Sequence, residues 1–284
     1  MRRVVSILNL VLIVAIGGFA AAALVRLSPG FDIDENAWNP RLSATTLQAM
    51  RASRIRDNRL PRFYFRYLRA AVHGDFGQSD SFKTPVADLL RERAPVSVRL
   101  IVWGTAGGLL FGAVAAWIAV WPRRAGLEIV AVSTSGLMLA IPPAVLALAF
   151  FFEETPLFLA VALALFPRVF GTIRAVLEDL FASSPLLAAR ARGIGPAALA
   201  IRYVLAPALP QWLALIGVSL VLAFGFIIPI EALCDIPGIG QLAWKAALAR
   251  DLPLLCGLAL IITFAVACVQ SLSEWIASPE GFRN

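Results

Sequence analysis

Apolar stretches long enough to cross a lipid bilayer recur along this chain of 284 residues, and they constrain its fold more than any other feature. An α-helix rises 1.5 Å per residue, so about 20 apolar residues cross a hydrocarbon core about 30 Å thick. The apolar segments of roughly that length are residues 4–25, 98–121, 127–152, 156–173, 211–230 and 254–276. They predict an all-α polytopic membrane protein with about six transmembrane helices.

Composition agrees with this interpretation and argues against other classes. Hydrophobic residues make up 60% of the chain and charged residues 15%, whereas soluble domains carry about 25% charged residues. A large soluble helical protein is therefore disfavoured. The net charge is +7, but the basic residues are scattered among apolar runs, so nucleic acid is not an expected partner. Three cysteines and a single histidine do not form the pattern of a disulfide framework or a metal site.

Charged residues between the apolar runs predict which side of the membrane each loop faces. The first run follows a basic start and is longer than the core of a signal peptide, so it is expected to be an uncleaved span with a cytoplasmic N-terminus. Arg123 and Arg124 then fall in a cytoplasmic turn, and Glu153 falls outside. The C-terminus is expected in the cytoplasm as well. The adjacent carboxylates Glu178 and Asp179 are expected to be solvated charges.

Residues 29–95 are polar and arginine-rich, and they are expected to form an extracytoplasmic loop. Their positive charge does not oppose this, because loops longer than about 60 residues translocate largely regardless of charge. The spacing of Phe63, Tyr64 and Tyr67 predicts an amphipathic helix within the loop. That helix lies either on the membrane surface or on the protein, and the spacing favours neither.

Prolines inside the apolar runs predict broken or kinked helices. Pro142, Pro143 and Pro167 each remove a backbone donor, and broken helices at membrane depth are tolerated where they line a cavity or are buried in protein. This favours a transporter or channel over a plain anchor.

Arg168 is the main charge inside a run and is close enough to the cytoplasmic end to snorkel. The glycines of residues 104–108 would let helix backbones approach closely.

Residues 184–210 are the most informative segment, and they are expected on the cytoplasmic side. An alanine-rich helix ends at Gly193, which can adopt the left-handed conformation that stops a helix. A second short helix follows, and a proline is expected to begin the next span. The pattern predicts a compact helix-turn-helix that presents its arginines to the cytoplasm.

This segment resembles the ATPase-docking loop of a known family, the inner-membrane permeases of binding-protein-dependent ABC importers, in the dipeptide, oligopeptide and nickel branch. Ala188, Ala189 and Gly193 occupy the positions of the Ala-Ala and Gly of that loop, and Leu187 stands where the general pattern has Glu. Further pieces similar to the branch follow one another in the expected order: 26–30 (RLSPG), 73–79 (HGDFGQS), 93–97 (RAPVS), 140–143 (AIPP), 236–240 (IPGIG) and 250–253 (RDLP). The connection around Glu153 is much shorter than the branch usually has.

The resemblance implies a single transmembrane permease domain, residues 1–284, in a bacterial inner membrane. Its partners would be a second permease chain, expected to be a different homologous subunit, two ATPase subunits and an extracytoplasmic substrate-binding protein. ATP and Mg²⁺ would be bound by the partner ATPase, so this chain would be no enzyme and would hold no catalytic, cofactor or metal residues. Peptide is the leading expectation for the cargo, beside nickel, metal chelates and other small solutes.

The resemblance also implies which residues would couple the chain to the ATPase. They are Ala188, Ala189, Arg190, Arg192, Gly193 and Arg202. A second hypothesis concerns Asp235, Pro237, Gly238 and Gly240, which form a turn with few side chains and would act as an outer gate or contact the binding protein. The alternative is a turn with only a packing role.

Two other classes of function stay open. An ion-coupled secondary transporter would usually place Asp, Glu or His within its spans, and the predicted spans are nearly free of them. A membrane scaffold would not need the cytoplasmic element. Co-purification with an ATPase would separate the importer from both alternatives.

Overall fold

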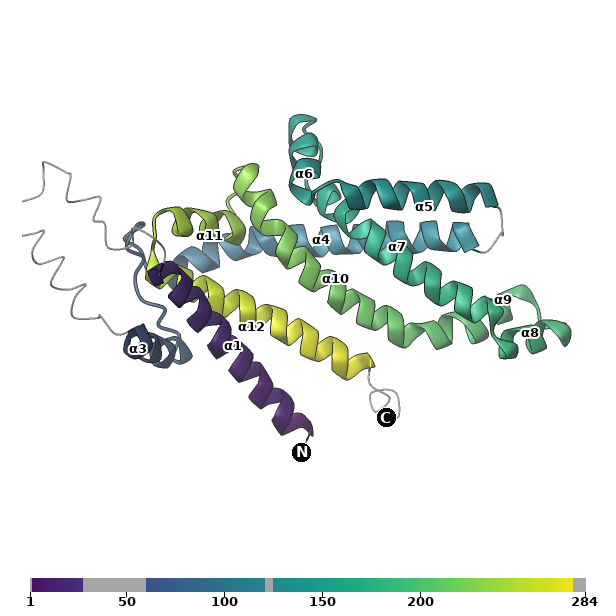
Figure 1. Cartoon of the computed structure of the whole chain (residues 1–284), viewed down its shortest axis with the longest axis horizontal. Coiled ribbons are helices and arrows are strands. Elements are labelled where there is room, and N and C mark those ends of the chain that lie inside the picture. The colour runs from purple at the N-terminus through teal and green to yellow at the C-terminus, as the bar shows by residue number, and fades with distance from the viewer. Residues whose placement is uncertain (1, 28–59, 121–124, 278–284) are drawn as a thin grey trace, which may run out of the picture. The chain divides into compact units, whose positions relative to one another are not determined.

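The computed structural model describes residues 2–27, 60–120 and 125–277, and every regular element among them is a helix (Figure 1). The predicted all-α polytopic class is confirmed. Four helical segments of the described residues are long and apolar enough to cross a membrane: Val86–Val120, Phe158–Ala182, Pro196–Leu233 and Leu252–Ser273. A bent pair, Gly126–Ala140 with Pro143–Phe152, is a fifth candidate. The first helix, α1 (Arg2–Leu27), has a described apolar stretch of Leu12–Leu24.

The chain divides into two compact units. The first unit contains residues 1–95 and 241–267, and the second contains residues 96–240 and 268–284. Three helices, α4 (Val86–Val120), α11 (Ile239–Leu248) and α12 (Leu252–Ala277), have residues in both units. Residues 28–59, the larger part of the expected extracytoplasmic loop, lie outside the described residues.

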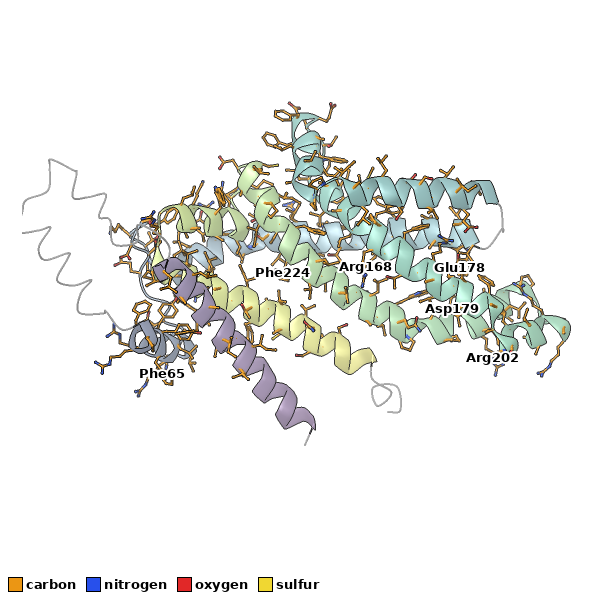
Figure 2. The ribbon with its side chains drawn as sticks, viewed as in Figure 1. Phe65, Arg168, Glu178, Asp179, Arg202 and Phe224 are labelled. Carbon is orange, nitrogen blue, oxygen red and sulfur yellow. The ribbon has the colours of Figure 1, made fainter. Side chains whose placement is uncertain are left out.

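In the first unit, α3 (Leu60–Val72) is the amphipathic helix that the sequence predicts, and its buried face packs on the protein. Tyr64 and Tyr67 form a core with Ala22 of α1 and Cys256 of α12. The Tyr64 hydroxyl donates to the carbonyl oxygen of Ala15 in α1, 2.7 Å away. The opposite face of α3 carries the exposed side chain of Phe65 (Figure 2).

A buried carboxylate fastens the loop after α3 to the start of α12. Asp251 accepts hydrogen bonds from the Ser79 hydroxyl at 2.5 Å and the Ser81 N–H at 2.9 Å, and it caps α12 by accepting from the Leu254 N–H at 3.1 Å. The Tyr67 hydroxyl donates to the carbonyl of Pro253. Burial raises the pKa of Tyr67 well above its usual value, so this hydroxyl stays a donor. Two motifs far apart in the sequence, 73–79 and 250–253, therefore meet in space.

The second unit is built around α7 (Phe158–Ala182), with α5 (Ala125–Ala140), α6 (Pro143–Phe152) and α10 (Ala206–Leu233) packed against it. The glycine-rich face of α4 makes the close helix contact that the sequence predicts, and its partner is α7. A β-carbon placed at Gly104 would lie 2.6 Å from Val161, and one at Gly112 would lie 2.5 Å from Val169. Only glycine permits this approach.

The run 127–152 is broken, as its prolines predict. Pro142 has extended backbone angles, Pro143 begins α6, and the two helices meet at a bend of 94°. Pro167, by contrast, lies within an unbroken α7.

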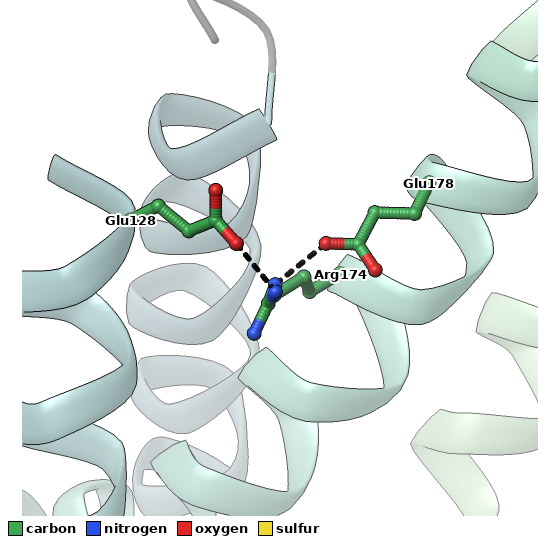
Figure 3. Close-up of polar contacts among 3 residues, drawn as sticks. All are labelled: Glu128, Arg174 and Glu178. Atoms are coloured by element: carbon green, nitrogen blue, oxygen red, sulfur yellow. Dashed lines mark hydrogen bonds and ion pairs between the residues drawn. The ribbon is translucent and has the colours of Figure 1, made fainter. Parts of the chain in front are cut away.

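α7 continues beyond the predicted end of its run at residue 173, into a segment that carries ion pairs. Arg174 binds Glu128 of α5 at 2.6 Å and Glu178 of its own helix at 2.7 Å (Figure 3). Glu178 is exposed, as predicted for a solvated charge, and it also pairs with Arg174. Asp179 is exposed.

Candidate functional site

The predicted helix-turn-helix begins with α8 (Ser184–Ala191), which ends at a left-handed glycine. Gly193 has φ +75°. Its N–H donates to the Arg190 carbonyl at 3.0 Å, and the Ile194 N–H donates to the Ala189 carbonyl at 3.3 Å. This pair of bonds is a Schellman motif, and it confirms the left-handed conformation predicted for Gly193.

One face of α8 is buried and the other is exposed. Leu186 and Ala189 are buried in the core of the second unit. The exposed face carries Ala188, Arg190, Arg192 and the apolar side chain of Leu187, which is 51% exposed. The Arg190 guanidinium lies 5.6 Å from the centre of the Phe181 ring, an arrangement that holds the arginine near the end of α7. Of the predicted coupling residues in α8, Ala189 is therefore the buried one.

The second arm runs into α10 without a break. α9 (Pro196–Leu199) is followed by a π-helical turn, Ala200–Leu205, in which the Ala206 N–H donates to the Ile201 carbonyl. The expected proline is Pro207, which lies in the first turn of α10, although the helix continues into it from the π-helical turn. Pro207 cannot donate in an α-helical pattern, and the wider π turn absorbs the missing bond and keeps the helix continuous.

This arm adds two exposed side chains to those of α8. Ile201 is 63% exposed, and Arg202 is exposed beside it (Figure 2), whereas Val204 is buried. Among the exposed residues of the two arms, we define the hairpin surface as Leu187, Ala188, Arg190, Arg192, Ile201 and Arg202. This surface combines the apolar side chains of Leu187 and Ile201 with three arginines.

At the other end of α10, Glu231 is fully buried and holds the turn of residues 235–240. Its carboxylate accepts from the Gly240 N–H at 2.6 Å and from the Ser97 hydroxyl of α4 at 2.7 Å. The Ser97 oxygen in turn accepts from the Ile239 N–H at 2.7 Å. These N–H groups begin α11 (Ile239–Leu248) and have no partner within that helix, so Glu231 and Ser97 cap it from outside.

The glycines of this turn are required for close approach. Gly238 and Gly240 are both buried, and a β-carbon at Gly240 would lie 2.7 Å from the backbone of Ile228. The exposed residues of the turn are Asp235, which has φ +49°, and Pro237. Of the residues predicted for an outer gate, only these two present surface, while the glycines face Glu231.

Glu231 is the residue that sequence reasoning missed. It lies one residue beyond the predicted span 211–230, but within α10. A carboxylate in the last turn of an otherwise apolar helix is a signal for a functional or anchoring role, and the predicted end of the span concealed it.

Comparisons with known proteins cover most of the chain, including the hairpin and the turn. Residues 108–278 match the protein family described as binding-protein-dependent transport system inner membrane component. The nickel import system permease protein NikB of Staphylococcus aureus strain MRSA252 is 24% identical over 285 residues, which cover 94% of this chain and 87% of that protein. NikB of strain USA300 is 24% identical over 267 residues, which cover 88% of this chain and 81% of that protein.

Proposed function

Because the chain belongs to the family of binding-protein-dependent transport system inner membrane components, we propose that its hairpin surface receives a partner ATPase and that α10 carries the resulting movement to the turn of residues 235–240. The chain is an inner-membrane permease of an ABC importer and is itself not catalytic, because ATP is bound by the partner ATPase. The proposal concerns how this chain uses that partner.

One observation carries the proposal. A single run of helix, Pro196–Leu233, joins the hairpin surface to Glu231. At 1.5 Å per residue, its 38 residues span about 57 Å. Continuous helices transmit displacement with little loss, whereas a flexible linker would not. Movement of Arg202 at one end therefore displaces the carboxylate that holds Gly240 at the other.

The chemistry of the hairpin surface suits an ATPase groove. Leu187 and Ile201 supply apolar side chains that lose water on docking, and Arg190, Arg192 and Arg202 supply a charged rim that orients the partner. The buried Ala189 packs this surface onto the core of the second unit, so a displacement of the surface also displaces α7 and α10.

The remaining parts of the proposal follow the positive-inside rule and the family. The hairpin and both termini lie in the cytoplasm, and the turn of residues 235–240 lies outside. A second permease chain, expected to be a different homologous subunit, completes the pathway with two ATPase subunits, and an extracytoplasmic binding protein delivers the cargo. The cargo is a small solute, with peptide as the first candidate, and the name of the similar NikB proteins adds nickel.

Co-purification tests the docking. Ile201→Glu places a charge on the hairpin surface without touching the core, and we expect it to reduce recovery of the ATPase with the solubilised permease by tenfold or more (an order-of-magnitude expectation for a charge buried in an interface). Leu248→Glu is the control, because Leu248 is also exposed (68%) but lies beyond the turn, in α11. Equal recovery of the ATPase from both variants would contradict the proposal.

A further inference from the structure

The surface that α7 leaves exposed differs from that of the other long helices. Its exposed positions are Arg168, Gly171, Ala175, Glu178, Asp179 and Ala182. At 100° per residue they fall within one stripe about 100° wide, which we call the α7 stripe. None of them is a large hydrophobic residue. The other long helices do expose such residues, for example Leu110 and Phe111 in α4, Val218 in α10 and Phe264 in α12.

This contrast indicates that the α7 stripe does not face lipid tails. Helix faces in contact with hydrocarbon carry large apolar side chains, whereas small and charged residues line protein contacts or water. Gly171 supports this, since a β-carbon placed there meets no atom within 4 Å. The glycine is therefore not required for packing within the described chain, unlike Gly104 or Gly112 of α4.

Of the charges on the stripe, Arg168 lies farthest along α7 from the hairpin (Figure 2). It follows the first residue of α7 by ten positions, about 15 Å, and precedes Arg174 by six, about 9 Å. Side chains on a helix tilt toward its N-terminus, which is the outer end of α7 in the proposed orientation. The guanidinium is therefore directed toward the outer end of α7 and away from the hairpin. Among the described residues, Arg168 has no ion-pair partner within 4.0 Å.

We infer that the α7 stripe lines the aqueous pathway of the importer and that Arg168 binds a carboxylate group of the transported solute. The inference rests on the proposed function, because it needs a pathway for a solute. A guanidinium forms two parallel hydrogen bonds with a carboxylate and remains charged at any physiological pH. This paired, charge-assisted contact distinguishes a solute with a carboxylate from one without.

The same charge disfavours a bare divalent cation as cargo. An uncomplexed Ni²⁺ ion would be repelled by the guanidinium as it passed the middle of α7. A carboxylate can reach this site from two sources, a peptide with a free C-terminus or a metal ion held by a carboxylate chelator. Both present the same group to Arg168.

Cysteine labelling tests the stripe in the full complex. Gly171→Cys and Ala175→Cys should react with membrane-impermeant methanethiosulfonates well above the background of the three native cysteines, two of which are buried. Leu110→Cys, on the apolar face of α4, should not. For Gly171→Cys, we compare the labelling rate with an anionic reagent to the rate with a cationic reagent. Adding Arg168→Gln should lower this ratio of anionic to cationic rates about five- to tenfold. Adding Arg168→Lys, which keeps the positive charge, should leave the ratio unchanged.

Other outcomes of the labelling would overturn the inference. If the cysteines on the stripe do not react, and if the second permease chain no longer co-purifies with Arg168→Gln, the stripe is a contact between the two permease chains. If the ratio of anionic to cationic labelling rates is the same with Arg168→Gln as without it, Arg168 does not bind anions. Recovery of the ATPase with the unsubstituted chain is measured in parallel. Its failure would count against the proposed function, whereas the labelling pattern decides the role of the stripe.

Protection of Gly171→Cys from labelling identifies the source of the carboxylate. Protection by dialanine and not by dialanine amide assigns it to a peptide, and protection by nickel citrate assigns it to a chelate. Protection by nickel sulfate alone, or by none of these probes, would contradict carboxylate recognition.

Discussion

The backbone N–H of Gly240 donates to the Glu231 carboxylate across 2.6 Å, and this bond joins the last turn of α10 to the first turn of α11. The two residues are nine positions apart in the sequence. The geometry depends on the intervening Gly238, since a β-carbon at that position would overlap the Glu231 carboxylate. The turn that resembles a family motif is therefore held by a residue outside the motif.

Removal of the carboxylate should loosen this turn. In Glu231→Ala, the Ser97 hydroxyl and the Gly240 N–H lose their acceptor in a buried site, and we expect the free energy of unfolding to fall by roughly 2–4 kcal/mol. Glu231→Gln keeps one acceptor oxygen and should lose less. Thermal unfolding of the purified permease in detergent measures the difference. Equal stability of the alanine and glutamine variants would show that the hydrogen bonds are not the source of the effect.

Gly193 should be needed for coupling rather than for folding. Its φ of +75° strains any side chain with a β-branch, at a cost of about 1–2 kcal/mol, but a β-carbon there meets no atom within 4 Å. Gly193→Val should therefore fold and yet misdirect the hairpin surface, so that ATP hydrolysis continues while uptake falls. Gly193→Asn is the matched control, because asparagine tolerates the left-handed conformation. Unchanged uptake in Gly193→Val would contradict the lever.

The close contact of α4 with α7 should make Gly112 intolerant of any side chain. Gly112→Ala forces a β-carbon to within 2.5 Å of Val169 and 3.0 Å of the Phe170 backbone, so we expect a loss of about 1–3 kcal/mol from overpacking. Gly136→Ala, in α5, meets no atom within 4 Å and should be neutral or stabilising by up to about 1 kcal/mol. Unfolding midpoints of the two variants test this, and similar midpoints would mean that α4 moves away from α7 without cost.

Much of the fold follows from apolar length and from glycine and proline. The broken span at Pro142, the close approach at Gly104 and the left-handed turn at Gly193 each need only local chemistry, and each is present in the structure. Element ends were harder to predict. α7 extends past its apolar run, and in this extension Arg174 binds carboxylates on two helices, a contact that depends on the packing of α5.

The candidate site was predictable in part. The predicted coupling residues are exposed except for Ala189, whose burial depends on how α8 lies on the core. Hydropathy alone does not indicate that Glu231 points into the protein, nor that Gly238 and Gly240 face it. The continuity of the second arm with α10 was also hidden, because a proline usually ends a helix, and here a π turn accommodates Pro207 instead.

Asp251 should hold the loop after α3 in place. It accepts bonds from Ser79, Ser81 and Leu254 while 1% exposed, so Asp251→Ala should cost roughly 2–3 kcal/mol and open residues 73–85 to protease. Ser79→Ala removes one of these bonds, and because the two side chains touch, the double variant should lose less than the sum of the single losses. Unfolding of the four proteins and the rate of limited proteolysis measure the coupling. Strictly additive losses would mean that Asp251 acts only as the cap of α12, and that the loop is held by other contacts, such as that of Tyr67 with the Phe76 carbonyl.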